Sequence, residues 1–148
     1  MDCGVLSLLN NYSIRDWIID NVPEVEGYGN YKQTFKNKIP DHAVFKESLR
    51  NEHEGDIGVF VINSGDDWTM KYCKVSQAEI QIVVNAVHGD VEGAERLLQN
   101  LFDNLHNNKG NDKIKITSCH KINLRAGGKN TNGIHWSVLN ILIKYILM

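Results

Sequence analysis

Residues 79–105 read EIQIVVNAVHGDVEGAERLLQNLFDNL and contain, in order, a strand, a turn and a helix. The first part, the core of a strand expected over 70–88, alternates and then becomes apolar on both faces, which is typical of a central strand. Gly89 and Asp90 end the strand, and an aspartate is well suited to cap a helix. The helix is expected to bury the residues that recur at helical spacing, namely Val91, Ala94, Leu97, Leu98, Leu101, Phe102 and Leu105.

Further strands are expected on both sides of this unit. The patterns predict a strand over 57–62, a turn over 63–67, and two more strands over 113–124 and 134–147. In the strand over 113–124, alternation predicts that Ile114, Ile116 and Ile122 point inward. Residues 126–133 contain three glycines and two asparagines, so a mobile loop is expected there.

The N-terminal part predicts two short helices over residues 2–22, with Ser13 near the start of the second and Pro23 after its end. The stretch 23–55 favours loops around its glycines. A chain of 148 residues can bury one hydrophobic core. We therefore predict a single α+β domain over residues 1–148, in which a mixed, mostly antiparallel sheet packs against one long amphipathic helix and short N-terminal helices.

Composition narrows the class of protein. The formal net charge of -2 and the pI near 6.3 exclude a strongly basic nucleic-acid-binding protein by bulk charge. Three cysteines, Cys3, Cys73 and Cys119, show no pairing pattern, which favours a reducing cytoplasm over a secreted disulfide framework. The first residues do not resemble a signal peptide, and the longest apolar stretch, 138–148, is shorter than the ~20 residues of a membrane-spanning helix.

Nothing in the sequence has the spacing of a catalytic, cofactor or metal site. Cys119 and His120 are adjacent, and neighbours on a strand point to opposite faces, so they are not expected to form a nucleophile and its base. The acids and histidine of 47–54 lack a metal-ligand spacing, and the loop 126–131 lacks that of a phosphate-binding loop. We expect no enzymatic activity and no cofactor; a small hydrolase or transferase using Cys73 or Cys119 remains the alternative.

One segment stands out by its charge. Residues 109–129 contain a single acid, Asp112, against the cations Lys109, Lys113, Lys115, Lys121, Arg125 and Lys129. This asymmetry favours contact with DNA phosphates or with an acidic partner subunit. The competing interpretation is a hydrated hairpin whose lysines protect a sheet edge from aggregation. A nucleic-acid-binding module that uses this segment is thus one candidate function.

Four stretches together resemble a known family. They are 56–65 (DIGVFVINSG), 79–84 (EIQIVV), 89–98 (GDVEGAERLL) and 101–105 (LFDNL). Their pattern is similar to that of the small tail terminator and tail-completion proteins of long-tailed bacteriophages, often called minor capsid proteins. There, a Gln-Ile-x-Val strand is followed by a short turn and by a helix with Ala and Leu at regular spacing. An arginine often follows that strand in the family, whereas residues 85–87 here read NAV.

The resemblance implies a structural protein of the virion tail that is assembled in the host cytoplasm. Copies of the chain would form a ring, usually six-fold, that caps the finished tail tube, stops its polymerisation and presents a surface for head–tail joining. The partners implied are other copies of the chain, the tail tube protein and the head connector proteins, with DNA passing through the ring and no membrane involved. A head-side joining protein of the connector is the alternative. The partner-binding candidates are Lys113, Lys115, Lys121, Arg125 and Lys129, with Trp68 as a possible interface anchor.

Overall fold

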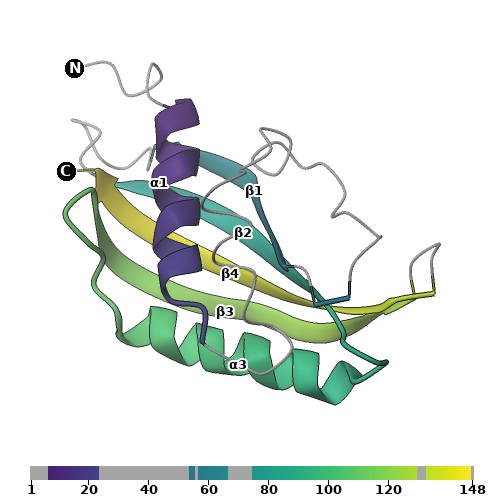
Figure 1. Cartoon of the computed structure of the whole chain (residues 1–148). Coiled ribbons are helices and arrows are strands. Elements are labelled where there is room, and N and C mark those ends of the chain that lie inside the picture. The colour runs from purple at the N-terminus through teal and green to yellow at the C-terminus, as the bar shows by residue number, and fades with distance from the viewer. Residues whose placement is uncertain (1–6, 24–53, 56, 67–74, 130–132, 148) are drawn as a thin grey trace.

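A computed structural model of the chain describes residues 7–23, 54–55, 57–66, 75–129 and 133–147 (Figure 1). Within these ranges two helices and four strands follow one another in a ββαββ arrangement preceded by a helix. The elements are α1 (Ser7–Asp20), β1 (Ile57–Asp66), β2 (Ser76–Asn85), α3 (Val91–Asn107), β3 (Ile114–Lys129) and β4 (His135–Leu147).

The four strands form one sheet in the order β1-β2-β4-β3, and each neighbouring pair is antiparallel. β1 pairs with β2, while β3 and β4 form a second hairpin, and α3 connects the two hairpins. Within the second hairpin, β4 pairs with both β2 and β3, whereas β3 pairs only with β4 among the described strands. β4 is an inner strand, and β3 lies at the edge of the sheet opposite to β1 (Figure 1).

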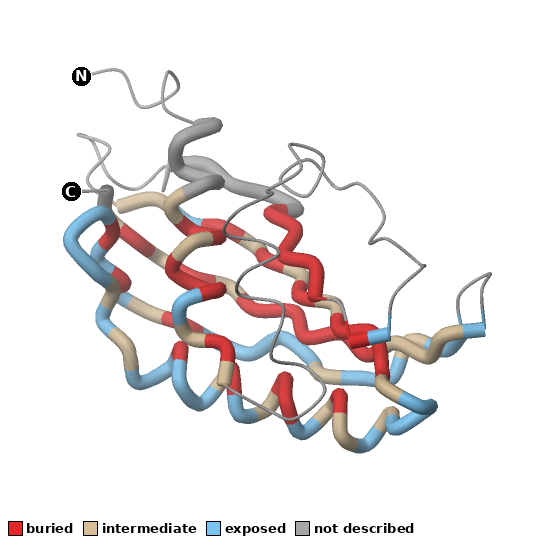
Figure 2. The backbone as a smooth tube through the Cα atoms, viewed as in Figure 1, coloured by how far each residue is buried: buried red, intermediate tan, exposed pale blue. Residues whose placement is uncertain are grey.

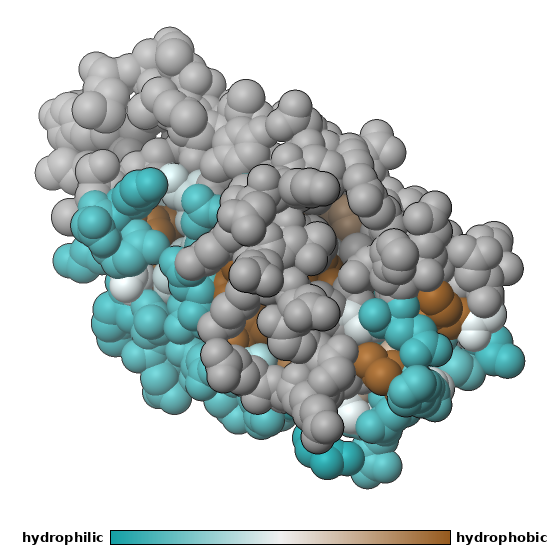
Figure 3. All heavy atoms as spheres, viewed as in Figure 1, coloured by the Kyte–Doolittle hydropathy of each residue, from teal (hydrophilic) through white to brown (hydrophobic). Residues whose placement is uncertain are grey.

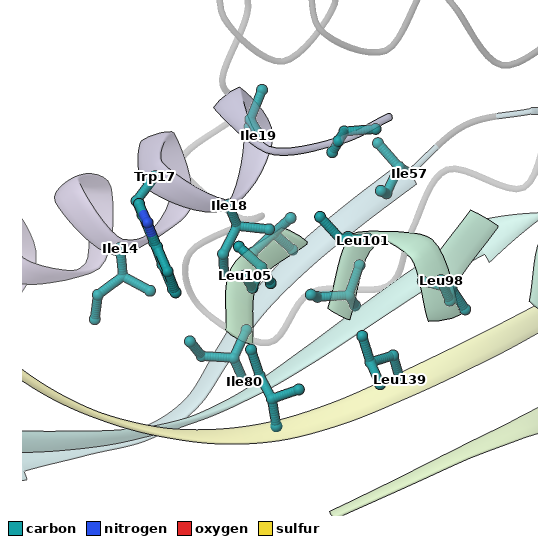
Figure 4. Close-up of a cluster of buried hydrophobic side chains, with 14 of the residues drawn as sticks. Ile14, Trp17, Ile18, Ile19, Ile57, Ile80, Leu98, Leu101, Leu105 and Leu139 are labelled. Carbon is teal, nitrogen blue, oxygen red and sulfur yellow. The ribbon is translucent and has the colours of Figure 1, made fainter. Parts of the chain in front are cut away.

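Both helices lie on one face of the sheet and close a single core. α3 runs along β3 and β4, and α1 lies over β1 (Figures 1 and 4). The core takes Trp17 from α1, Leu101 from α3 and Ile80 from the sheet, all with at most 1% of their surface exposed (Figure 4). Burial of such large apolar side chains is the main term that stabilises a fold of this size.

The alternation of apolar and polar residues along β2 explains why this strand lies at the centre of the core. Its residues Ile80, Ile82 and Val84 all face the helices and are fully buried, whereas the residues between them are half-buried. In the register of the sheet, Ile82 lies between Val59 of β1 and Leu139 of β4. The prediction of a central strand here is confirmed, although β2 is shorter than 70–88 and residues 67–74 lie outside the described residues.

Helix α3 begins where the sequence predicts it. The Asp90 side chain caps its first turn by accepting a hydrogen bond of 2.9 Å from the Gly93 backbone N–H. Its apolar stripe is buried against the sheet, and its outer side is hydrophilic (Figure 3). The buried residues of the helix are Ala94, Leu97, Leu98, Leu101 and Leu105.

A polar cluster joins the ends of the two helices. The Trp17 indole N–H donates to Asn108 Oδ1 at 3.0 Å, and Asn108 Nδ2 donates to Asn21 Oδ1 at 3.1 Å. Asn104 Nδ2 also donates to the Asn21 backbone carbonyl at 3.0 Å. Since Trp17 is 1% exposed, this cluster satisfies a buried donor at the point where α1 meets α3.

The predicted fold class is wrong in two respects. Instead of short N-terminal helices beside one long helix, the described part of the chain has a single N-terminal helix of 14 residues and a second helix of 17. The sheet is entirely antiparallel in the described ranges, not mixed. Ser13, expected to start a second helix, lies inside α1 because the tertiary contacts of residues 14–19 outweigh a local capping signal.

Two predicted connections are also wrong. β1 continues through Asn63 to Asp66, although the sequence there favours a turn, and a register shift between Val61 and Asn63 accommodates it. β3 continues to Lys129, so residues 126–129 are strand and not loop. In both places pairing with a neighbouring strand overrides turn-forming residues.

Candidate interaction surface

Among the residues whose burial is described, β3 is the most exposed strand of the sheet. Its first residues alternate between buried and exposed, but from His120 to Lys129 every residue is exposed except Leu124 and Gly127, which are half-buried (Figure 2). The neighbouring strand β4 is buried over residues 137–141. Among the described strands, the second half of β3 is therefore a ribbon paired along one side only, with exposed residues on both faces.

The chain's own atoms cover the start of the outer edge of β3. The Ile116 backbone N–H donates to the Lys109 carbonyl at 2.8 Å, and Gly110 forms an isolated bridge with Lys115. Farther along, His106 Nδ1 lies 3.0 Å from the Cys119 carbonyl oxygen. Beyond this point, no described strand pairs with the outer edge over residues 120–129.

Three register shifts interrupt the pairing of β3 with β4, between 116 and 118, 121 and 123, and 126 and 128. A bulge changes which face the following side chains occupy. As a result Cys119 and Leu124 continue the inward row that Ile114 and Ile116 begin, and Ile122 does not. The prediction that Ile122 points inward is wrong: 49% of its surface is exposed, the only exposed large hydrophobic residue in the described ranges.

The structure places the predicted cations on and beside this ribbon. Lys115, Lys121, Arg125 and Lys129 all lie on β3 and are exposed. Lys113 does not share a strand face with Lys115, because it precedes the strand. Its backbone N–H donates to the Asn111 side chain at 2.8 Å.

The bulges distribute the cations over both faces. Arg125 lies opposite Val138, on the face away from the helices, whereas Lys121 lies opposite Ile141 and Lys129 opposite His135, on the helix side.

Lys121 differs from the other cations because it is engaged within the chain. Its Nζ donates to Gln99 Oε1 at 2.9 Å, and it lies 5.5 Å from the centre of the Phe102 ring. No ion pair within the described ranges involves Lys115, Arg125 or Lys129. These three cations of β3, together with the exposed Lys113 before the strand, are the part of the predicted set whose side chains no described residue engages. Trp68 lies outside the described residues.

A tight packing contact supports the far end of the ribbon. A Cβ on Gly127 would clash with three ring atoms of Trp136 across the hairpin. Trp136 is half-buried, and its ring packs directly against the backbone of Gly127. The sequence offers the two glycines of 127–128 as a sign of close backbone approach, but it does not identify the ring.

The thiol chemistry considered from the sequence has no site at Cys119. This side chain faces the core and is 5% exposed, while His120 is exposed on the opposite face, as predicted from the alternation of a strand. Burial raises the pKa of the Cys119 thiol to about 11, so the thiolate is scarce at neutral pH. Cys3 and Cys73 lie outside the described residues.

The described residues show neither a metal site nor a membrane-spanning helix. No three histidine, cysteine, aspartate or glutamate side chains there gather closely enough to hold a metal ion. Neither of the two described helices is long and apolar enough to cross a membrane. No model of a known protein family matches the chain, and no curated protein sequence matches it either.

Proposed function

We propose that the chain is a structural subunit of a bacteriophage tail, which assembles into a ring, closes the end of the tail tube and provides a surface for joining the head. The observation that carries the proposal is the second half of β3, which is exposed on both faces along a sheet edge that no described strand pairs with. Such an edge suits a protein that completes its sheet or buries its surface against another subunit.

Two further points support a structural role over an enzymatic one. The resemblance of residues 56–105 to tail-completion proteins is a pattern of strand, turn and helix, without a catalytic signature. Cys119, the one described cysteine, is buried with a raised pKa. A rigid sheet and helix that carry an exposed ribbon are what a non-catalytic assembly subunit requires.

Electron microscopy of particles made without this chain tests the proposal and separates it from the head-side alternative. A terminator subunit predicts abnormally long tails, because tube polymerisation is no longer stopped. A joining protein of the connector predicts tails of normal length that are not attached to heads. Normal tails on normal heads would contradict both roles.

A nucleic-acid-binding module is the second candidate, since Arg125 and Lys129 are exposed on the ribbon and Lys115 is exposed near the start of β3. Phosphate neutralisation by these residues predicts duplex binding that weakens steeply as salt increases. Fluorescence anisotropy with a labelled duplex at several salt concentrations measures it. Binding that is absent at low salt would remove this candidate.

A further inference from the structure

The backbone of β3 directs hydrogen-bonding groups away from the sheet. Two of these groups are used by the chain itself, the Ile116 N–H and the Cys119 carbonyl oxygen. Both residues lie opposite odd-numbered residues of β4, and so do Lys121, Leu124 and Ala126. Because alternate residues of a strand direct their backbone groups to the same side, these three also point N–H and C=O groups outward. Within the described ranges, no residue beyond β3 hydrogen-bonds these outward groups.

A row of α3 side chains lies beside this outer edge. Gln99, Phe102 and His106 are three and four positions apart, which places them on one side of the helix that runs along β3 (Figure 1). Gln99 and Phe102 contact Lys121, and His106 reaches the outward Cys119 carbonyl oxygen. His106 thus occupies the edge at residue 119, and a segment that pairs with β3 would lie along residues 120–129.

The exposed side chains around this edge are basic or apolar. Residues 120–129 contain His120, Lys121, Arg125 and Lys129 and no acid. Arg125 lies on the face away from the helices, whereas Lys121 and Lys129 lie on the helix side, so acids on either face of an added strand can meet a cation. Ile122, which is 49% exposed, offers an apolar contact at the same edge. A nucleic-acid backbone would use the cations but neither the apolar side chain nor the outward backbone groups.

We propose that residues 120–129 of β3 bind an extended, acidic segment of another protein, which adds to the sheet as a strand beyond β3. Main-chain hydrogen bonds to the outward groups hold the segment, and the cations select its charge. Within 120–129, the register shifts leave residues 123–126 as the longest uninterrupted part, so we expect the added strand to be centred there. The inference deepens the proposed head–tail joining surface and rests on it, because it names the chemistry of the segment that this surface binds.

A designed peptide tests both the charge and the strand. A fluorescein-labelled ten-residue peptide of alternating glutamate and valine is titrated with the full-length chain at low salt, and fluorescence anisotropy measures the dissociation constant. Replacing every glutamate by lysine should weaken binding about tenfold or more. Two further peptides carry N-methyl groups on one or the other alternate set of amides. Only the set that faces β3 donates to it, so one methylated peptide should bind about tenfold more weakly and the other should bind almost unchanged.

Two results of this titration would overturn the proposal. If the glutamate peptide does not bind at low salt, the lysines and bulges of β3 protect the edge against added strands. If both methylated peptides bind as well as the parent, the edge attracts acidic chains by charge alone and adds no strand.

Amide hydrogen exchange locates the added strand. With the glutamate peptide at saturation, the outward amides of Lys121, Leu124 and Ala126 should exchange about tenfold more slowly, measured by NMR on the ¹⁵N-labelled chain. The amides of Asn123 and Arg125 point toward β4 and serve as internal controls, because an added strand does not bond to them. Binding that leaves the outward amides unchanged would contradict strand addition. Tighter binding of a DNA duplex, again without slower exchange, would instead favour the nucleic-acid-binding candidate.

Charge reversal tests the contribution of the cations. Arg125→Glu should weaken binding of the glutamate peptide about tenfold at low salt and strengthen binding of the lysine peptide. Arg96→Glu makes the same charge change at an exposed position of α3 and should leave both affinities unchanged. An equal loss of glutamate-peptide binding in the two variants would show that net charge, and not the β3 edge, attracts the peptide.

These results are separable from a failure of the proposed function. If particles without the chain show tail defects but the edge binds no acidic peptide, the tail function stands and the strand addition fails. If the peptide binds and slows the outward amides but particles without the chain have normal tails and heads, the binding site stands and the tail function fails.

Discussion

Replacing Asn108 by alanine should destabilise the fold more than its position at the end of a helix suggests. Asn108 Oδ1 accepts two hydrogen bonds, from the Trp17 indole N–H at 3.0 Å and from the Gly110 backbone N–H at 2.8 Å. Its Nδ2 donates to Asn21 at 3.1 Å. Alanine removes all three bonds and leaves the indole donor, on a side chain that is 1% exposed, without its partner.

The expected cost follows from the kind of group that loses its partner. A buried donor left unsatisfied costs about 1–3 kcal/mol, and each of the two other bonds contributes about 0.5–1.5 kcal/mol before discount for partial exposure. We therefore expect Asn108→Ala to lower the free energy of unfolding by about 2–4 kcal/mol. Urea denaturation followed by circular dichroism and tryptophan fluorescence measures it.

The neighbouring asparagine provides a matched control. Asn107 is exposed, and its side chain makes one hydrogen bond within the helix, to the Asp103 carbonyl at 2.9 Å. Asn107→Ala should therefore change stability by about 0.5 kcal/mol or less. If the two variants lose equal stability, the link between α1 and α3 contributes nothing. Trp17→Phe completes a double-mutant cycle with Asn108→Ala, in which the combined loss should be smaller than the sum of the single losses.

Three other perturbations probe the core, the thiol and the hairpin. Leu98→Ala, at a fully buried position of α3, should lower the free energy of unfolding by about 2–5 kcal/mol in a thermal or urea melt. Asn100→Ala, at an exposed position of the same helix, should not cause such a loss. Burial raises the pKa of the Cys119 thiol from 9.0 to about 11, so the unfolded chain loses this proton first as pH rises. The free energy of unfolding should thus fall between these two pH values, and it should fall more steeply than in Cys119→Ala. If the two proteins have parallel pH profiles, burial does not raise the pKa of the Cys119 thiol. Gly127→Ala should destabilise the hairpin by about 1–3 kcal/mol because its Cβ meets the Trp136 ring, and a smaller loss in a Trp136→Ala background would show that the ring is the cause.

The parts of the fold that the sequence predicts well are those with an uninterrupted period. The apolar spacing of 94–105 and the Asp90 cap define α3 because a helix is determined by residues three and four positions apart. β2 is predictable for the same reason, since alternation fixes which of its side chains are buried. In both elements the local pattern and the tertiary contacts require the same face to be apolar.

β3 shows why a period alone is not enough. Each of its three register shifts changes the face of the residues that follow. Gly127 and Gly128 mark the last shift, but no residue type marks the first two. The row of isoleucines 114, 116 and 122 therefore suggests a single inward face, while the structure replaces Ile122 with Leu124 in that row. Contacts such as Trp17 with Asn108, 91 residues apart, are likewise decided only when the helices meet.

Some features of the candidate surface can be predicted from neighbouring residues in the sequence, whereas others depend on how the strands pair. The excess of cations in 109–129 is visible in the sequence because the residues are neighbours along the chain. The engagement of Lys121 is not visible, since its partner Gln99 lies 22 residues away in the chain. The pairing of β4 with β2 leaves β3 at the edge of the sheet, where its second half is exposed. A local excess of charge predicts that a segment binds something, whereas the strand order and the bulges determine which of its cations are exposed at the sheet edge and on which face.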